Sequence, residues 1–394
     1  METDKRLKVL FIPKWYPNRN DSMHGLFVQR HALAVSEYAD VSVLFVVSDE
    51  RNKQVFEIET HVQNGITEIL IYTKKYHSKI AILNSIVNGY RYLTAHIAGW
   101  KIIEQTDNKP DINHVHILTR AGIMALYFKI RHHIPYVITE HWSRYLLHHQ
   151  DGYSGLLRKK LTTKVLKEAS GVSTVSYSLK QAMENVGLHH SNWKIIPNVV
   201  DTKLFQIPQN IKQEKIIRIS HISCFEEQSK NISGILRAAK KLKELGHNFE
   251  LVMIGDGIDW QQTKQTADEL KLGNSIRFTG VLEGQDLVDE MSQCHFSVLF
   301  SNYETFAIVI PENLSMGIPV IATDVGGIPE VLPKEFGKLI PPKDEESLAT
   351  AMIYMMEHWQ DYDAEAMQNY VEENYSYDEV GHQFYEMYRA VLDE

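Results

Sequence analysis

Short segments rich in β-branched and aromatic residues alternate with helical stretches along the chain, and this alternation limits the possible folds most strongly. In the first half the predicted strands cover 8–12, 41–47, 66–72, 114–117, 135–139 and 172–176. A polar, proline-containing segment at 203–215 is typical of a linker. The alternation then restarts, with strands predicted at 216–222, 249–254, 276–280 and 296–300. We therefore predict an α/β protein with two doubly wound domains, residues 1–202 and 203–374.

The composition is that of a globular protein and argues against several classes. The chain has 394 residues, 44% of them hydrophobic, and a net charge of −9, which disfavours nucleic acid as a partner. Two cysteines, Cys224 and Cys294, are too few for a disulfide framework or a cysteine-rich metal site. A polar start at 1–8 and the lack of a long apolar run predict neither a signal peptide nor a membrane-spanning helix. The 19 histidines show no metal-binding spacing, so we expect no metal cofactor. The two cysteines suit a reducing compartment, so we expect a cytoplasmic protein.

The segment 301–312 carries the strongest functional signal. It follows the apolar run 296–300, which is typical of a buried parallel strand. Glu304 is expected in the loop that leaves this strand, and Glu312 in the first turn of the next helix, because Pro311 suits a first helical turn. Two carboxylates eight positions apart are suited to different parts of one elongated ligand. A helix N-terminus beside them favours a phosphate.

This segment resembles the E-x7-E signature of family 4 glycosyltransferases, and the following 317–330, with its Gly326-Gly327 pair, also matches that family. The resemblance implies the GT-B fold, in which two Rossmann-like domains face a central cleft. It also implies that a C-terminal helix, 375–394, packs back on the first domain. The resemblance covers nearly the whole chain, although its most specific motifs lie between residues 296 and 330.

The resemblance assigns a role to each residue of the signature. Glu304 would contact the donor sugar, Glu312 would hold the ribose hydroxyls, and the amides of Thr305, Phe306 and Ala307 would bind the diphosphate. The family usually has glycine at the position of Ala307. If the backbone there has a positive φ, alanine is strained and its amide contact is weakened.

Two segments of the first domain also match the family. The loop 13–25, with its Trp15-Tyr16-Pro17 sequence, resembles the loop that lies over the donor phosphates and the acceptor, which makes Gly25 a candidate donor-binding residue. His141 follows the strand 135–139 and resembles the histidine that contacts the donor sugar. His116 also ends a predicted strand. For both histidines the alternative is a structural hydrogen-bond partner.

The loop after the strand 216–222 departs from the family. Family members use an arginine and a lysine of this loop to bind the diphosphate, and Lys230 matches the lysine. Glu226 or Gln228 stands where the arginine is expected. The loss of an arginine removes a bidentate phosphate contact that lysine does not replace.

A basic helix is predicted at 156–169. Its cationic residues are Arg158, Lys159, Lys160, Lys164 and Lys167. They form either a solvated face or a patch for anionic lipid or a lipid-diphosphate acceptor. The second alternative predicts peripheral contact with the inner face of the membrane.

Taken with the resemblance, these features predict a retaining, metal-independent hexosyltransferase. It would move a sugar from a nucleotide-sugar to a saccharide or lipid-linked acceptor, in cell-surface polysaccharide or glycoconjugate biosynthesis. Two other functions stay open. One is a GT-B nucleotide-sugar epimerase or phosphorylase. The other is a non-catalytic sugar-nucleotide binding protein, which the missing loop arginine favours.

Overall fold

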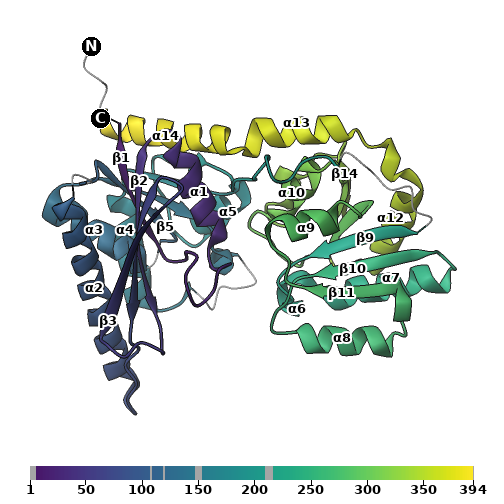
Figure 1. Cartoon of the computed structure of the whole chain (residues 1–394), viewed down its shortest axis with the longest axis horizontal. Helices are drawn as coiled ribbons and strands as arrows, with labels where there is room; N and C mark the ends of the chain where they lie inside the picture. The colour runs from purple at the N-terminus through teal and green to yellow at the C-terminus, as the bar shows by residue number, and fades with distance from the viewer. Residues whose placement is uncertain (1–5, 107–108, 119, 147–152, 209–215, 394) are drawn as a thin grey trace. The chain divides into compact units, whose positions relative to one another are not determined.

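The computed structural model describes residues 6–106, 109–118, 120–146, 153–208 and 216–393 (Figure 1). Its contacts divide the chain into two compact units. Unit 1 comprises the described residues of Met1–Val175, Leu179–Val199 and Tyr377–Glu394. Unit 2 comprises those of Ser176–Ser178 and Val200–Ser376. The division thus falls between Val199 and Val200, whereas the boundary predicted from the sequence lies after residue 202.

Unit 1 contains one eight-stranded sheet in the order β3-β4-β2-β1-β5-β6-β7-β8. Its strands are β1 (Lys8–Pro13), β2 (Asp40–Ser48), β3 (Phe56–Gln63), β4 (Ile66–Thr73), β5 (Ile112–His116), β6 (Tyr136–Glu140), β7 (Gly171–Thr174) and β8 (Trp193–Ile195). Neighbouring strands are parallel except β3 and β4, which form an antiparallel hairpin. The sequence analysis did not predict β3, although the Asn64-Gly65 turn that precedes β4 is a strong hairpin signal.

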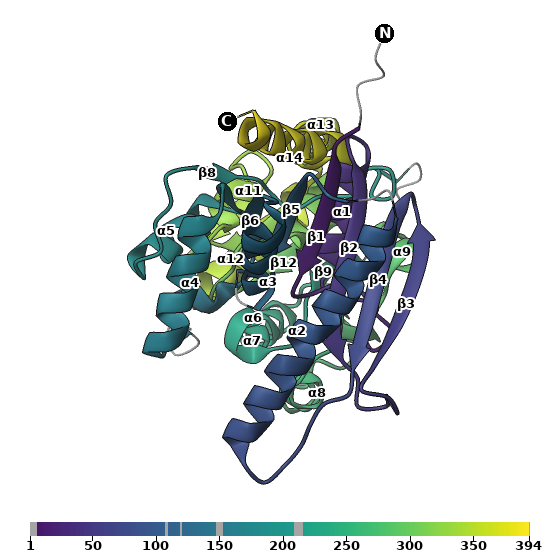
Figure 2. The same cartoon turned by 90° about the vertical axis from the view of Figure 1, so that its left-hand side faces the viewer.

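Helices pack on this sheet. They are α1 (Leu26–Ser36), α2 (Ala81–Gln105), α3 (Arg120–His132), α4 (Leu156–Glu168), α5 (Tyr177–Asn185) and α14 (Tyr377–Leu392), with a 3₁₀ turn at Ser143–Tyr145. Figure 2 shows α2 running over the face of the sheet at β2 and β4. The last helix, α14, packs against α1. Because helices cover the sheet, strands such as β1 and β5 are buried along most of their length.

Unit 2 contains a fully parallel six-stranded sheet in the order β11-β10-β9-β12-β13-β14. Its strands are β9 (Ile217–Ile222), β10 (Phe249–Ile254), β11 (Ile276–Gly280), β12 (Phe296–Leu299), β13 (Val320–Thr323) and β14 (Gly337–Ile340). Its helices are α6 (Glu227–Lys230), α7 (Ile232–Glu244), α8 (Trp260–Glu269), α9 (Gly284–Met291), α10 (Val309–Ser315), α11 (Ile328–Val331), α12 (Glu345–His358) and α13 (Ala364–Tyr375), with 3₁₀ turns at Gly273–Ser275 and Trp359–Asp361. The prediction of a doubly wound α/β fold is confirmed in each unit.

Each sheet has a point where the strand order changes direction, and that point positions the candidate site. In unit 2 it lies between β9 and β12, and in unit 1 between β1 and β5. In open α/β sheets, ligands bind beyond the carboxyl ends of the strands at such a switch point. The loops after β1 and β12 carry Gly25 and residues 304–307. Lys230 and Glu312 lie in the helices α6 and α10 that follow β9 and β12, and His141 follows β6, the neighbour of β5.

Among the described residues, no helix combines the length and the apolar character that crossing a bilayer requires.

Candidate functional site

The loops after β9 and β12 meet at the switch point of unit 2 through an ion pair. Lys230, at the end of α6, donates a hydrogen bond to the carboxylate of Glu304 in the loop after β12. The Ser301 hydroxyl donates to the same carboxylate at 2.9 Å. The two charged side chains are only 16% and 12% exposed. Burial disfavours the charged form of Lys230, but the Glu304 carboxylate outweighs it and raises the pKa of the lysine. The structure thus brings together two predicted site residues that lie 74 positions apart in the sequence.

The backbone of residues 305–307 presents unused donors. Within the described part of the chain, the amides of Thr305, Phe306 and Ala307 donate no hydrogen bond to the protein. Ala307 has a φ of 64°, in the left-handed region that disfavours residues with a Cβ atom. The strain expected for alanine at this position is therefore present. A bare N–H group outside regular structure needs an acceptor, which a ligand can provide.

Gly326 allows this loop to adopt its path. Its φ is 55°, and a Cβ atom there would lie 1.9 Å from the carbonyl oxygen of Glu304. The amide of the next residue, Gly327, donates to that same oxygen at 3.3 Å. The glycine pair that supported the family resemblance therefore supports the loop that carries Glu304.

Glu312 lies in the first turn of α10, as predicted, and the residue is 6% exposed. The helix begins at Val309, so Pro311 lies within its first turn, where a missing N–H leaves no bond unmade. The structure places Glu312 one helical turn beyond the strained Ala307. Glu312 is therefore a buried carboxylate in the helix that directly follows the loop of residues 305–307.

In unit 1, His141 follows β6 and belongs to a buried cluster of imidazoles. Its Nε2 lies 3.1 Å from Nδ1 of His116, and His31 of α1 completes a group whose nitrogens lie within 4.8 Å of one another. Burial, reinforced by His31 and His114, lowers the pKa of His141 well below its usual value, so the ring is neutral at pH 7. It can therefore donate or accept one hydrogen bond without introducing charge.

This trio is the one group among the described residues that is close enough to hold a metal ion. Histidine spacing along the chain did not reveal it, because the three residues come from α1, the end of β5 and the end of β6. Two of its nitrogens, His116 Nδ1 and His141 Nε2, already bond to each other, and His31 Nε2 lies 3.0 Å from the carbonyl oxygen of Pro197. The other ring nitrogens of the three residues, His31 Nδ1, His116 Nε2 and His141 Nδ1, are buried and have no hydrogen-bond partner among the described residues.

Gly25 caps the start of α1 with a φ of 75°. A Cβ atom at Gly25 would lie 2.4 Å from the carbonyl carbon of Trp15, so glycine lets the loop after β1 fold back on itself. Trp15 in turn contacts Trp142, with ring centroids 5.2 Å apart. The loops that carry Gly25 and His141 are therefore packed together within unit 1.

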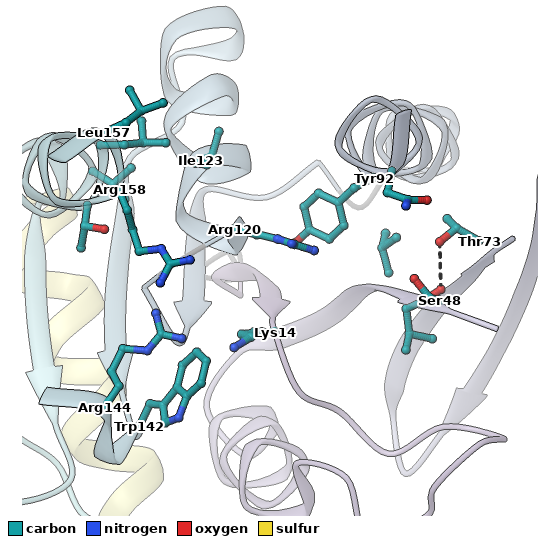
Figure 3. Close-up of a pocket in the computed structure, with 16 residues that line it drawn as sticks. Lys14, Ser48, Thr73, Tyr92, Arg120, Ile123, Trp142, Arg144, Leu157 and Arg158 are labelled. Carbon is teal, nitrogen blue, oxygen red and sulfur yellow. Dashed lines mark hydrogen bonds between the residues drawn. The ribbon is translucent and has the colours of Figure 1, made fainter. Parts of the chain in front are cut away.

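Unit 1 also contains a cavity of about 690 Å³ that the sequence analysis missed (Figure 3). Four cationic side chains line it: Lys14, Arg120, Arg144 and Arg158. Only Arg158 was predicted as functional, as part of the basic helix. Lys159, Lys160, Lys164 and Lys167 line a separate depression. The predicted basic face of α4 is therefore not one patch. Lys14, Arg120 and Arg144 each follow a strand of the sheet, at the edge where ligands bind. This position is the sequence signal that could have identified them.

Two family models match the chain. The model for glycosyl transferases group 1 matches residues 202–375, and the model for glycosyltransferase family 4 matches residues 46–204. A Bacillus subtilis (strain 168) glycosyltransferase named for teichuronic acid biosynthesis is 24% identical over 372 residues, which cover 90% of each chain.

Solved structures share the fold over almost the entire chain. Sucrose-phosphate synthase from Thermosynechococcus elongatus has a TM-score of 0.77 at 17% identity and covers 98% of this chain and 99% of its own. The HepE protein of Anabaena, solved in complex with UDP, has a TM-score of 0.74 at 17% identity, with coverage of 98% and 100%. At these identities the likeness establishes the fold, which is GT-B.

Proposed function

Because the chain belongs to the family 4 glycosyltransferases and has the GT-B fold, we propose that it transfers a hexosyl group from a nucleotide-sugar to an acceptor hydroxyl. We propose further that the reaction retains the anomeric configuration and serves cell-surface polysaccharide or glycoconjugate biosynthesis. The observation that carries the donor half of this proposal is the Lys230–Glu304 pair beside three unused loop amides.

The pair suggests how the donor would be recognised. A diphosphate entering the loop would compete with Glu304 for the Lys230 ammonium and would accept hydrogen bonds from the amides of residues 305–307. Glu304, released from the lysine, would then be free to accept hydrogen bonds from sugar hydroxyls. Glu312, one turn into α10, would hold the ribose hydroxyls. In this arrangement donor binding itself prepares the carboxylate that orients the sugar.

In the proposed reaction the bond between the anomeric carbon and the phosphate oxygen breaks as the acceptor oxygen bonds to the same carbon. The departing diphosphate takes the hydroxyl proton, so no carboxylate nucleophile is required. Lys230 and the loop amides would stabilise the charge that develops on the diphosphate. His141 would contact the donor sugar through its neutral ring, and Gly25 would border the donor phosphates.

Metal independence is part of the proposal. The lysine and the amides provide the positive potential that a divalent ion provides elsewhere. Activity in excess chelator, equal to activity with added Mg²⁺ or Mn²⁺, is the expected result. Loss of activity that either ion restores would contradict it.

Peripheral contact with the inner face of the membrane is proposed through α4. Its Lys159, Lys160, Lys164 and Lys167 line an open depression, and Leu156 and Leu157 at its start are each 81% exposed. Cationic and apolar residues on one surface helix are typical of interfacial binding. Co-sedimentation with anionic but not neutral vesicles, reduced in a K160E/K164E variant, is the expected result.

The proposed activity is best tested without knowledge of the acceptor. The purified chain is incubated with a panel of nucleotide-sugars, and products are followed by mass spectrometry and NMR. We expect slow hydrolysis of one donor to a free sugar with the α or β configuration of that donor. An altered nucleotide-sugar formed without acceptor would instead identify an epimerase. Binding without turnover on a broad acceptor panel would identify a sugar-nucleotide binding protein, for which Gln228 in place of the family arginine is the structural support.

A further inference from the structure

The cavity of unit 1 concentrates positive charge from four separate segments. Lys14 follows β1, Arg120 begins α3, Arg144 lies in the 3₁₀ turn after β6, and Arg158 lies in α4. Figure 3 shows the side chains of Arg144 and Arg158 directed toward each other beside Lys14, with Arg120 extending toward Tyr92. None of the described residues that line the cavity is acidic. Like charges gathered around one cavity repel one another, so an anion that enters beside Lys14, Arg120 and Arg144 is stabilised.

The nearest buried carboxylate, Glu140, is engaged elsewhere. One of its oxygens accepts hydrogen bonds from the amides of His141 and Trp142, each at 2.9 Å. The other accepts from the amide of Leu118 at 3.0 Å and from the Tyr145 hydroxyl at 3.3 Å. These bonds fix the loop after β6. Glu140 contributes to the potential around Lys14, but its oxygens are used by donors outside the group of four cations.

An aromatic ring holds two of the cations without neutralising them. The Trp142 ring centroid lies 3.2 Å from Nζ of Lys14 and 3.1 Å from Cζ of Arg144. Arg144 is only 7% exposed, and its Nε is buried without a hydrogen-bond acceptor among the described residues. A buried guanidinium N–H without a partner is costly, and an oxyanion would satisfy it.

The protonation state of Lys14 reflects the same crowding. Burial and the neighbouring Arg144 charge lower the pKa of Lys14 to about 7, and the charges of Arg120 and Arg158 act in the same direction. Glu140 opposes this shift but does not reverse it. A lysine with this pKa is poised to gain a full charge when an anion enters.

The rest of the lining describes the remainder of the ligand. Apolar side chains, among them Val46, Ile123 and Leu161, share the cavity with the cations. Thr73 and Asn88 also line the cavity, and their side chains already bond to the backbone of Val47 and Tyr76. The volume of about 690 Å³ is far larger than a single phosphate requires. A ligand that fits has an oxyanion at one end and a sugar or hydrocarbon portion at the other.

We propose that this cavity is the acceptor subsite of the enzyme, and that the acceptor carries a phosphate or carboxylate group that Lys14, Arg120 and Arg144 bind. The proposal deepens the proposed transferase function and rests on it for the word acceptor. Oxyanion binding itself does not depend on that function. The cations distinguish a charged acceptor from a neutral saccharide, because a neutral ligand would leave them uncompensated.

The test measures anion binding by calorimetry on the full chain. A K230Q background removes the proposed contribution of the donor diphosphate loop. Pyrophosphate and a hexuronate are the soluble probes, and phosphatidylcholine vesicles with and without phosphatidate are the lipid probe. R120Q is the main variant because Arg120 is exposed and its replacement should leave the fold intact. R144Q is the second variant, and R131Q, which replaces an exposed arginine of the same helix α3 outside the cavity, is the matched control.

We expect at least one probe to bind the parent. R120Q and R144Q should each weaken that binding about tenfold or more, the usual effect of losing a charged hydrogen bond, and R131Q should leave it unchanged. A response to the soluble probes identifies a soluble acceptor anion, and a response to phosphatidate vesicles alone identifies a lipid phosphate. No binding of any probe, or equal loss in R131Q, overturns the proposal. Anion binding in a chain that turns over no nucleotide-sugar would uphold the subsite and reject the transferase function.

Discussion

The two units differ in the charges that surround a buried lysine. In unit 2, Lys230 has a carboxylate partner, Glu304, and its pKa is raised. In unit 1, Lys14 is surrounded by Arg120, Arg144 and Arg158, and its pKa is lowered to about 7. Lys230 can exchange the Glu304 carboxylate for a ligand anion. Lys14 has no carboxylate to exchange, and an anion that binds beside it stabilises its charged form. The comparison suggests that the first site exchanges one anion for another and that the second collects one.

The largest expected effect is on Lys230. Lys230→Ala removes the one loop cation matched to the donor diphosphate and leaves Glu304 buried without it. We expect kcat/KM to fall about 10³-fold, the upper range for loss of an electrostatic group, with the fold retained. Steady-state kinetics and circular dichroism measure both. Near wild-type kcat/KM would show that the paired lysine is structural, and Gln228→Arg should then fail to tighten donor binding.

His141 of unit 1 is expected to act on the donor sugar and not on the nucleotide. His141→Ala should lower kcat about 10²-fold, because the sugar loses a positioning contact, while affinity for the nucleotide alone stays unchanged. Glu304→Ala should behave alike, and the double variant should lose less than the product of the two effects if both residues orient one sugar. Kinetics of the two singles and the double decide this. A normal kcat in His141→Ala would leave this residue as a structural member of the imidazole cluster.

Glu312 tests whether the donor site around the Lys230–Glu304 pair extends along the loop to the first turn of α10. Glu312→Ala should weaken nucleotide binding by about 1.5–3 kcal/mol, the scale of a hydrogen bond to a charged group. Calorimetry with the nucleoside diphosphate of the identified donor measures the loss. Because Glu312 is buried, Glu312→Gln is the matched control for the fold and should recover part of the affinity. Unchanged affinity in Glu312→Ala would remove the ribose role.

The pH dependence of anion binding tests the crowded lysine. Lys14 is charged below pH 7 in the free protein and loses its proton above it, so an anion must restore that proton at higher pH. Sulfate, which does not titrate near neutrality, should bind to the K230Q variant best below pH 7. Its affinity should weaken by up to about tenfold per pH unit above that value. The slope should vanish in Lys14→Met. A slope that persists in this variant would assign the titration to another group.

The smallest expected effect concerns Ala307. Its φ of 64° costs an alanine about 1–2 kcal/mol, part of which the entropy of a glycine replacement offsets. Ala307→Gly should therefore stabilise unit 2 by about 0.5–1 kcal/mol in urea unfolding. Ala307→Val should destabilise it. A destabilised glycine variant would indicate that the left-handed conformation is not strained.

The sequence predicted the elements better than the contacts between them. The alternation of strands and helices gave two doubly wound units, and Pro311 correctly placed Glu312 in a first helical turn. Strand order was not readable, so the approach of Lys230 to Glu304 could not be foreseen as an ion pair. The resemblance marked both residues, but it assigned them to a ligand and not to each other.

The same limit explains the missed cavity. Lys14 and Arg144 stand just beyond predicted strands, yet only the neighbouring order β1-β5-β6 brings their loops together. The cluster of His31, His116 and His141 arises in the same way. The hairpin strand β3 is a different case, because the Asn64-Gly65 turn was visible in the sequence.

Whether the two units hold different anions can be decided by one titration. UDP, GDP and ADP are titrated by calorimetry into the parent chain, Lys230→Ala and Arg120→Gln. The account predicts that one nucleotide binds the parent, that Lys230→Ala loses most of this affinity, and that Arg120→Gln keeps it. Nucleotide binding that survives in Lys230→Ala and is lost in Arg120→Gln would contradict the account and move the donor to the cationic cavity.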